Sequence, residues 1–271
     1  MLRKKRKSNQ NFLRGGYRQY RAPSVFGGGK APKPKREFQL PKINIKLIVY
    51  TVATIFALYY VLLSGKFSVK DIIVEGAHLT SDDKVLPYIN KGSNILFLNT
   101  SSLRKKILTE NPQIKDVQIV RGIPDAVKIV LLEHENKIIW QSSGSKYLIS
   151  AQGEATKRVE DGETFNYPIV NDSKNLPVIL GQSIVSPNFI AFIVNINEKF
   201  FEATNIKQTY FEVPQTTFDL YLYTEAGFYV KFNSMRSSAK QLENLKKVLV
   251  EKRSDVHEYV DLRIDGWAYY K

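Results

Sequence analysis

The sequence predicts an α+β protein in which a single transmembrane helix precedes two folded domains. One observation is an uncharged apolar run over residues 47–63. A second is that the segment after this run indicates the order strand, helix, helix, strand, strand. A third is that short stretches of β-branched and aromatic residues dominate residues 136–271, with two amphipathic helices among them. From residue 66 onward there are about two hundred residues, which is enough for one large or two small hydrophobic cores.

The apolar run is long enough to anchor the chain in a membrane. A helix over residues 47–63 spans roughly 25 Å, and Ile43 and Ile45 extend it toward the roughly 30 Å of a hydrocarbon core. We therefore expect a transmembrane helix over residues 43–64, anchored by Leu47, Phe56, Tyr59 and Leu63. A buried helix of a soluble domain would show a polar stripe, and a cleaved signal peptide would not follow such a long basic segment, so both alternatives are less favoured.

The basic residues gather before the apolar run. The chain carries a net charge of +14, and residues 1–46 account for +13 of it, with Glu37 as their one acidic residue. A positive flank predicts that the N-terminal side lies in the cytoplasm and that the long C-terminal part lies outside. Because residues 1–42 are rich in Lys, Arg, Gly and Pro, we expect a disordered basic cytoplasmic tail. Arginine and tyrosine alternate over residues 14–21 as in RNA-binding segments, but a tail resting on anionic lipid is favoured and no nucleic acid is expected.

The first predicted domain covers residues 66–135. Its two helices have clear start signals, since Thr80 or Ser81 can cap the first and Asn99–Ser102 offers several caps for the second. The second helix must stop before Pro112. The expected strands are 67–76, 114–121 and 126–133, the last two joined by a tight turn.

The second predicted domain covers residues 136–271. Strands are expected over 138–140, 147–150, 218–223, 228–232, 259–264 and 267–270. Ser186 and Pro187 begin one amphipathic helix, and a second is expected over 237–252. The residues of the first helix expected to face the core are Phe189, Ile190, Ile193, Val194, Phe200 and Phe201.

The sequence lacks the patterns of catalysis and metal binding. There is no cysteine, so disulfides and thiolate metal sites are excluded, and none of the three histidines has a second histidine at ligand spacing. A Ser-x-x-Lys match begins at Ser143, but three further matches and the absence of a Lys-Thr-Gly segment mark it as background. Glu133-His134-Glu135 could hold a metal only if alternate strand residues converged, so we interpret Glu133 as structural. We expect no enzymatic activity, no cofactor and no metal.

Several stretches of the chain together resemble a known family. They are Val69–Gly76, then Pro124–Trp140 with Pro124, Ile129, Glu133 and Trp140, then Tyr147–Ile149 with Gly153, Leu176–Pro177 with Gly181, and finally Tyr259–Arg263. In this order they are similar to the FtsQ/DivIB family of bacterial cell-division proteins. The similarity covers most of residues 45–271.

The resemblance implies a fold and a function. It implies that residues 66–135 form a POTRA domain and that residues 136–271 form a β-rich domain that binds partners. It further implies a non-enzymatic protein of the cytoplasmic membrane at the division septum, which joins the coiled-coil division proteins FtsB (DivIC) and FtsL, helps to assemble the divisome and so helps to control septal peptidoglycan synthesis. The alternative is a POTRA-containing factor for outer-membrane protein assembly or secretion, which normally has repeated POTRA units or a barrel. A cell-wall enzyme is a third alternative, but it lacks a nucleophile in context.

We expect the partner-binding site at the end of the chain. A late strand at a sheet edge presents unpaired N–H and C=O groups, to which a partner strand can add. We predict that residues 259–270 form this edge, with Ile264 and Trp267 as apolar anchors and Arg263 as a rim charge. Tyr259, Asp261 and Tyr269 complete the predicted site. The alternative is that these residues only close the hydrophobic core.

Overall fold

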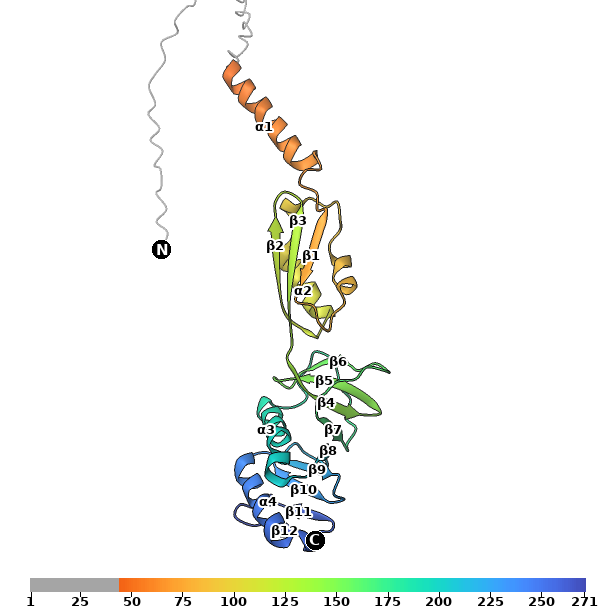
Figure 1. Ribbon diagram of the computed structural model, residues 1–271. Coiled ribbons are helices and arrows are strands. Elements are labelled where there is room, and N and C mark those ends of the chain that lie inside the picture. Colours follow the sequence, from red (N-terminus) through yellow and green to blue (C-terminus); the bar gives the residue numbers. More distant parts are fainter. Residues whose placement is uncertain (1–43) are drawn as a thin grey trace, which may run out of the picture. The chain divides into compact units, whose positions relative to one another are not determined.

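The computed structural model describes residues 44–271, so the tail predicted for residues 1–42 lies outside the described residues. Helix α1 (Ile45–Leu63) confirms the predicted apolar helix (Figure 1). In the described part of the chain it is the one helix long and apolar enough to cross a membrane. The four predicted anchor residues Leu47, Phe56, Tyr59 and Leu63 all expose their side chains on it.

The first domain is a three-stranded sheet packed against a helix. Its strands are β1 (Asp71–Glu75), β2 (Ile114–Gly122) and β3 (Ala126–Glu133), in the order β1-β3-β2. Strand β3 is parallel to β1 and antiparallel to β2. Alternate residues of β3 face a core that includes Leu103 and Ile107 of helix α2 (Thr100–Glu110). The Asn99 side chain accepts a hydrogen bond from the Ser102 N–H, which caps α2 as predicted.

The first predicted helix of this domain differs from a regular α-helix. It consists of two short 3-10 helices, η1 (Asp82–Lys84) and η2 (Leu86–Tyr88), and a third, η3 (Ile95–Phe97), precedes α2. Pro87 is the second residue of η2 and has no N–H to continue a helix from η1. A helical segment therefore lies where it was predicted, but it is two three-residue 3-10 helices, and the predicted caps are wrong: Ser81 makes no side-chain capping hydrogen bond, and the Thr80 hydroxyl is buried without a partner in the described residues.

Glu133, at the end of β3, has the structural role that the sequence predicted. Its two carboxylate oxygens accept hydrogen bonds from the Leu79 N–H at 3.0 and 2.9 Å. One of them also accepts from the Thr80 N–H at 2.8 Å. The carboxylate thus satisfies two backbone donors of the loop that leaves β1, and it fastens that loop to β3.

The second domain is built on a nine-stranded mixed sheet with the order β12-β11-β10-β9-β8-β7-β4-β5-β6 (Figure 1). The strands are β4 (Asn136–Ser142), β5 (Ser145–Ser150), β6 (Ala155–Arg158), β7 (Ile169–Asp172), β8 (Gln208–Val213), β9 (Asp219–Thr224), β10 (Tyr229–Asn233), β11 (Tyr259–Asp261) and β12 (Tyr269–Tyr270). Strands β9 and β10 form the predicted hairpin.

Helices α3 (Pro187–Thr204) and α4 (Ser238–Lys252) cover one face of this sheet (Figure 1). Ser186 and Ser237 cap them, each accepting a hydrogen bond from a first-turn N–H. Phe200 is fully buried in the core between the helices and the sheet. Phe201, which was also expected to face the core, is 49% exposed, because adjacent helical residues point about 100° apart. A short 3-10 helix, η4 (Arg253–Asp255), leads from α4 to β11.

Candidate partner-binding edge

The predicted site residues lie at one end of the nine-stranded sheet, but not all of them are on its edge. Tyr259 and Asp261 belong to β11, which pairs with β10 on one side and β12 on the other, so the prediction that residues 259–270 form one edge is wrong for β11. Strand β12 pairs with β11 through Tyr270 opposite Val260 and Tyr269 opposite Asp261. The next residue, Lys271, exchanges backbone hydrogen bonds with Tyr259 in both directions, at 3.1 and 3.3 Å. Strand β12 is therefore the terminal strand of the sheet, and β11 is the one strand of the sheet with which it pairs.

The pairing pattern defines which backbone groups remain at the open edge. In an antiparallel pair, the backbone N–H and C=O groups of successive residues alternate: those of one residue bond to the partner strand, and those of the next point away from it. Because Lys271 and Tyr259 form a hydrogen-bonded pair, Tyr269 also faces β11 and Tyr270 faces outward. The N–H and C=O of Tyr270, and by the same alternation those of Ala268, lie along the outer side of β12.

The apolar residues beside this edge are exposed. Ile264 and Trp267 close a turn in which the Trp267 N–H donates to the Ile264 carbonyl at 3.2 Å, and Gly266 supplies the positive φ of +75°. The Ile264 side chain is 53% exposed and that of Trp267 is 64% exposed. The ring of Trp267 stacks on the ring of Tyr269 at 6.5 Å. These side chains lie outside the buried core, whereas Val260 and Leu262 of the same segment are part of it, so the core-closing alternative holds for only part of residues 259–270.

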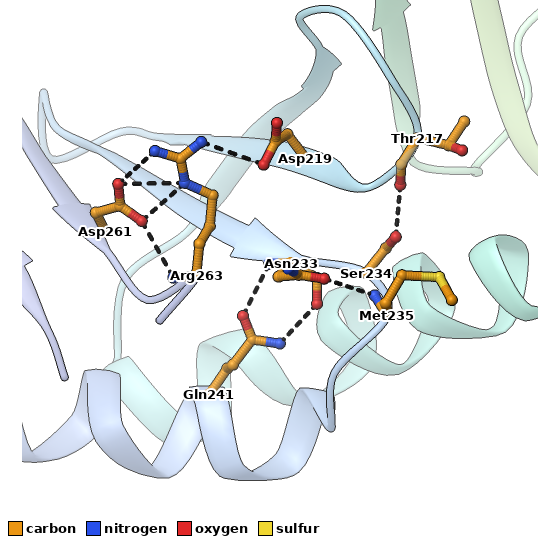
Figure 2. A network of polar contacts seen from close by, with 8 residues as sticks. All are labelled: Thr217, Asp219, Asn233, Ser234, Met235, Gln241, Asp261 and Arg263. Atoms are coloured by element: carbon orange, nitrogen blue, oxygen red, sulfur yellow. Dashed lines mark hydrogen bonds and ion pairs between the residues drawn. The ribbon is translucent and has the colours of Figure 1, made fainter. Parts of the chain in front are cut away.

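Arg263 is held by two carboxylates of its own domain (Figure 2). Its Nε and Nη2 donate to the two oxygens of Asp261 at 2.9 and 2.7 Å, and its Nη1 donates to Asp219 at 3.2 Å. Burial alone raises the pKa of Asp261, but the hydrogen bonds from Arg263 outweigh it and lower the pKa below its usual value. The same hydrogen bonds raise the pKa of Arg263. The structure therefore places the predicted rim charge in an internal ion-pair cluster.

A row of tyrosines crosses the sheet face opposite the helices. Tyr210 of β8 stacks on Tyr223 of β9 at 4.6 Å between ring centroids, and Tyr223 stacks on Tyr229 of β10 at 5.1 Å. The ring centroid of Tyr229 in turn lies 5.9 Å from that of Tyr259 of β11. The Lys231 Nζ lies over the Tyr259 ring, 3.7 Å from its centroid. Burial raises the pKa values of Tyr210, Tyr223 and Tyr229 above the ordinary value for tyrosine. The row ends next to the β12 edge.

Sequence reasoning missed both Asp219 and this row. The alternation of Tyr221, Tyr223 and Tyr229 within the predicted hairpin was a usable signal, since alternate strand residues share a face. For Asp219 there was no comparable signal, because its partner Arg263 lies 44 residues further along the chain.

Two protein-family models match most of the chain after the apolar helix. Residues 67–134 match the family model described as "POTRA domain, FtsQ-type", and residues 138–263 match the one described as "Cell division protein FtsQ/DivIB, C-terminal". The chain belongs to the FtsQ/DivIB family of cell division proteins. The second match includes Asp219, Asp261 and Arg263, and it ends just before the turn that leads to β12.

Individual FtsQ and DivIB proteins are similar over shorter stretches. Cell division protein FtsQ of Chloroflexus aurantiacus is 28% identical over 138 residues, which is 51% of this chain and 50% of that protein. FtsQ of Rickettsia bellii is 30% identical over 131 residues, covering 43% of this chain and 49% of that protein. Cell division protein DivIB of Clostridium acetobutylicum is 31% identical over 85 residues, covering 31% and 33%. The chain thus spans about half the length, or less, of these relatives. Helix α1, the one helix within residues 44–271 long and apolar enough to cross a membrane, fits a single-pass membrane anchor in a division protein.

Proposed function

We propose that this protein is a non-enzymatic, single-pass division protein that helps to assemble the divisome outside the cytoplasmic membrane. It does so by pairing the β12 edge with a strand of a membrane-tethered coiled-coil protein. This partner is FtsB/DivIC-like and is associated with an FtsL-like protein. The observation that carries the proposal is a terminal strand with outward-facing backbone groups beside exposed Ile264 and Trp267. By organising these partners at the septum, the protein helps to control septal peptidoglycan synthesis.

The two edges of the nine-stranded sheet support this choice of site. At the far edge, the N–H of Ala155 in β6 donates to the Gln182 carbonyl, and the Ala155 carbonyl accepts from the Gly181 N–H, so residues 181–183 already pair with the start of that strand. At the near edge, Tyr270 and Ala268 direct their backbone groups away from the domain. An uncovered edge is the geometry that β-augmentation needs, and the flanking apolar side chains provide the specificity that backbone hydrogen bonds lack.

Membrane tethering strengthens such an interaction. The basic flank predicts that the β-rich domain lies outside the membrane, on the same side as the exported segments of its proposed partners. Confinement to one membrane raises the effective concentration of tethered proteins for one another. An edge of modest intrinsic affinity can therefore assemble a stable complex.

The sharpest test removes one backbone donor from the edge. In the full chain reconstituted in nanodiscs, Tyr270→Pro deletes an N–H that points away from β11, and proline is tolerated at such edge positions. Tyr270→Ala is the matched control, because it removes the same side chain and keeps the N–H. We expect proline to weaken binding of the organism's own FtsB/DivIC-like protein about tenfold relative to alanine, since one hydrogen bond contributes about 1 kcal/mol or slightly more. Equal affinities for the two variants would contradict strand addition at β12.

A second test addresses the apolar anchors. Ile264→Glu and Trp267→Glu each place a charge where the proposal requires an apolar contact, so each should reduce partner affinity at least tenfold in a folded protein. Met235→Glu is the control, because Met235 is an apolar side chain at least as exposed as the two anchors and lies after β10 rather than beside the edge. In cells, depletion of the protein should give undivided filaments or chains, whereas normal septation with loss of outer-membrane proteins would favour the POTRA-containing assembly factor.

A further inference from the structure

We propose that Asp219, Asp261 and Arg263 form a clamp that positions the β12 edge for its partner, and that Arg263 acts through this clamp rather than as a direct partner contact. The inference rests on the proposed function of the edge. It adds Asp219, a residue distant from the edge in sequence, as a determinant of partner binding.

The clamp joins three neighbouring strands. Asp219 is the first residue of β9, and Asp261 is the last residue of β11, with β10 between them in the sheet. Arg263 comes two residues after β11 and reaches both carboxylates, as Figure 2 shows. The Leu262 N–H donates to the Lys231 carbonyl at 2.9 Å, so the backbone entering the clamp is also fixed to β10. The chain therefore leaves β11 in a direction set by contacts with β9 and β10.

The segment after the clamp has little structure of its own. The turn over residues 264–267 and the two-residue strand β12 come directly after Arg263. A strand of two residues is too short to specify its own orientation. At its far end, the backbone oxygen of Lys271 accepts hydrogen bonds from the N–H groups of His257, Glu258 and Tyr259. Besides its pairing with β11, the edge is thus held at its start by the clamp and at its end by Lys271, and we infer that the clamp sets the approach of Ile264 and Trp267.

Geometry separates positioning from direct contact. Three of the five guanidinium N–H groups of Arg263 are already used on its own carboxylates, and its side chain is two-thirds buried among them. Asp219 lies two strands inward from β11, and its carboxylate points to Arg263 rather than to the outer side of β12. Strands β10 and β11 separate β9 from β12, so a partner strand that pairs with β12 does not reach Asp219. An effect of Asp219 on binding would therefore be transmitted through Arg263.

The experiment measures the free edge and the bound partner separately. For the full chain in nanodiscs, hydrogen–deuterium exchange of residues 264–271 reports how firmly the edge is held, and titration with the organism's FtsB/DivIC-like protein reports affinity. The variants are Asp219→Asn, Arg263→Gln, the double variant and the conservative Asp219→Glu. Glu243→Gln is the control, since it breaks an exposed ion pair with Lys247 on α4.

We expect Asp219→Asn to accelerate exchange over residues 264–271 and to weaken partner binding about three- to tenfold. Arg263→Gln should weaken binding more, the double variant no more than Arg263→Gln alone, and Asp219→Glu should restore part of the affinity. The control should change neither measurement.

Two results would overturn the clamp. If Asp219→Asn leaves exchange and affinity unchanged while Arg263→Gln loses affinity, then Arg263 contacts the partner directly. If exchange accelerates but affinity does not change, the clamp stabilises the fold without positioning the edge. Failure of the proposed function is distinguishable from both, because it would also leave Tyr270→Pro and Trp267→Glu at normal affinity.

Discussion

Glu133→Ala should destabilise the POTRA domain through two backbone groups rather than through a lost ion pair. The carboxylate accepts the N–H groups of Leu79 and Thr80 at 2.8–3.0 Å, and alanine leaves both donors without this partner. An unpaired buried donor costs about 1–3 kcal/mol, and water partly reaches this site, so we expect a loss of about 2–3 kcal/mol in the free energy of unfolding. Glu133→Gln keeps one acceptor oxygen and should lose about 1 kcal/mol.

The assay is urea unfolding of the full chain in detergent micelles, combined with hydrogen exchange of the Leu79 and Thr80 amides. Exchange gives a local measurement, which matters because two domains need not unfold together. Glu135→Ala is the matched control: its side chain is 75% exposed and pairs only with Lys137, so the change should stay within about 0.5 kcal/mol. Equal losses for the Glu133 and Glu135 variants, with unchanged exchange at Leu79 and Thr80, would refute the reasoning.

Three further predictions concern the β-rich domain. Phe200→Ala should lower the free energy of unfolding by about 3–5 kcal/mol and Phe201→Ala by less than about 1 kcal/mol, as measured by urea unfolding, because only the first side chain is fully buried. Gly153→Ala should destabilise far more than Gly227→Ala in thermal unfolding: both have a positive φ, but a Cβ at Gly153 would lie 1.9 Å from a backbone oxygen, whereas Gly227 has open space. Folding lowers the pKa of Asp261 below its usual value of 3.8. The ionised carboxylate therefore stabilises the folded state above pH 3.8, and this stabilisation is lost as the pH falls through the folded-state pKa. Urea unfolding between pH 6 and pH 3 should show this loss of stability, and the Asp261→Asn variant should lack this pH dependence.

Local signals made the helices predictable. Asn99, Ser186 and Ser237 each begin a helix in the sequence and each caps one in the structure, because a cap depends on residues within one turn. Thr80 and Ser81 show the limit of this reasoning. Ser81 precedes η1, but its side chain makes no capping hydrogen bond, and the buried Thr80 hydroxyl has no hydrogen-bond partner in the described part of the chain. The segment forms short 3-10 helices instead of the predicted helix.

Long-range pairing was less predictable. Strands β6, β7 and β8 were not predicted. Strand β8 lies in the middle of the nine-stranded sheet, and its parallel partner β7 is separated from it in the sequence by the whole of α3. The terminal strand and the exposed Ile264 and Trp267 were accessible to prediction, because a strand signal and apolar residues around a glycine turn are local features. That these residues bind a partner remains a proposal. The engagement of Arg263 with Asp219 is a product of sheet order, which no local pattern encodes.

The two tryptophans give the protein a pair of built-in fluorophores in opposite surroundings. Trp140 is buried against the edge of the Phe189 ring, whereas Trp267 stands in solvent next to the β12 edge, and the chain has no other tryptophan. Collisional quenching by acrylamide or iodide therefore reports almost entirely on Trp267, while the unquenched blue-shifted emission reports on the core. Occupation of the edge would shield one signal and leave the other as an internal reference, so partner docking and loss of fold can be followed in one unlabelled sample.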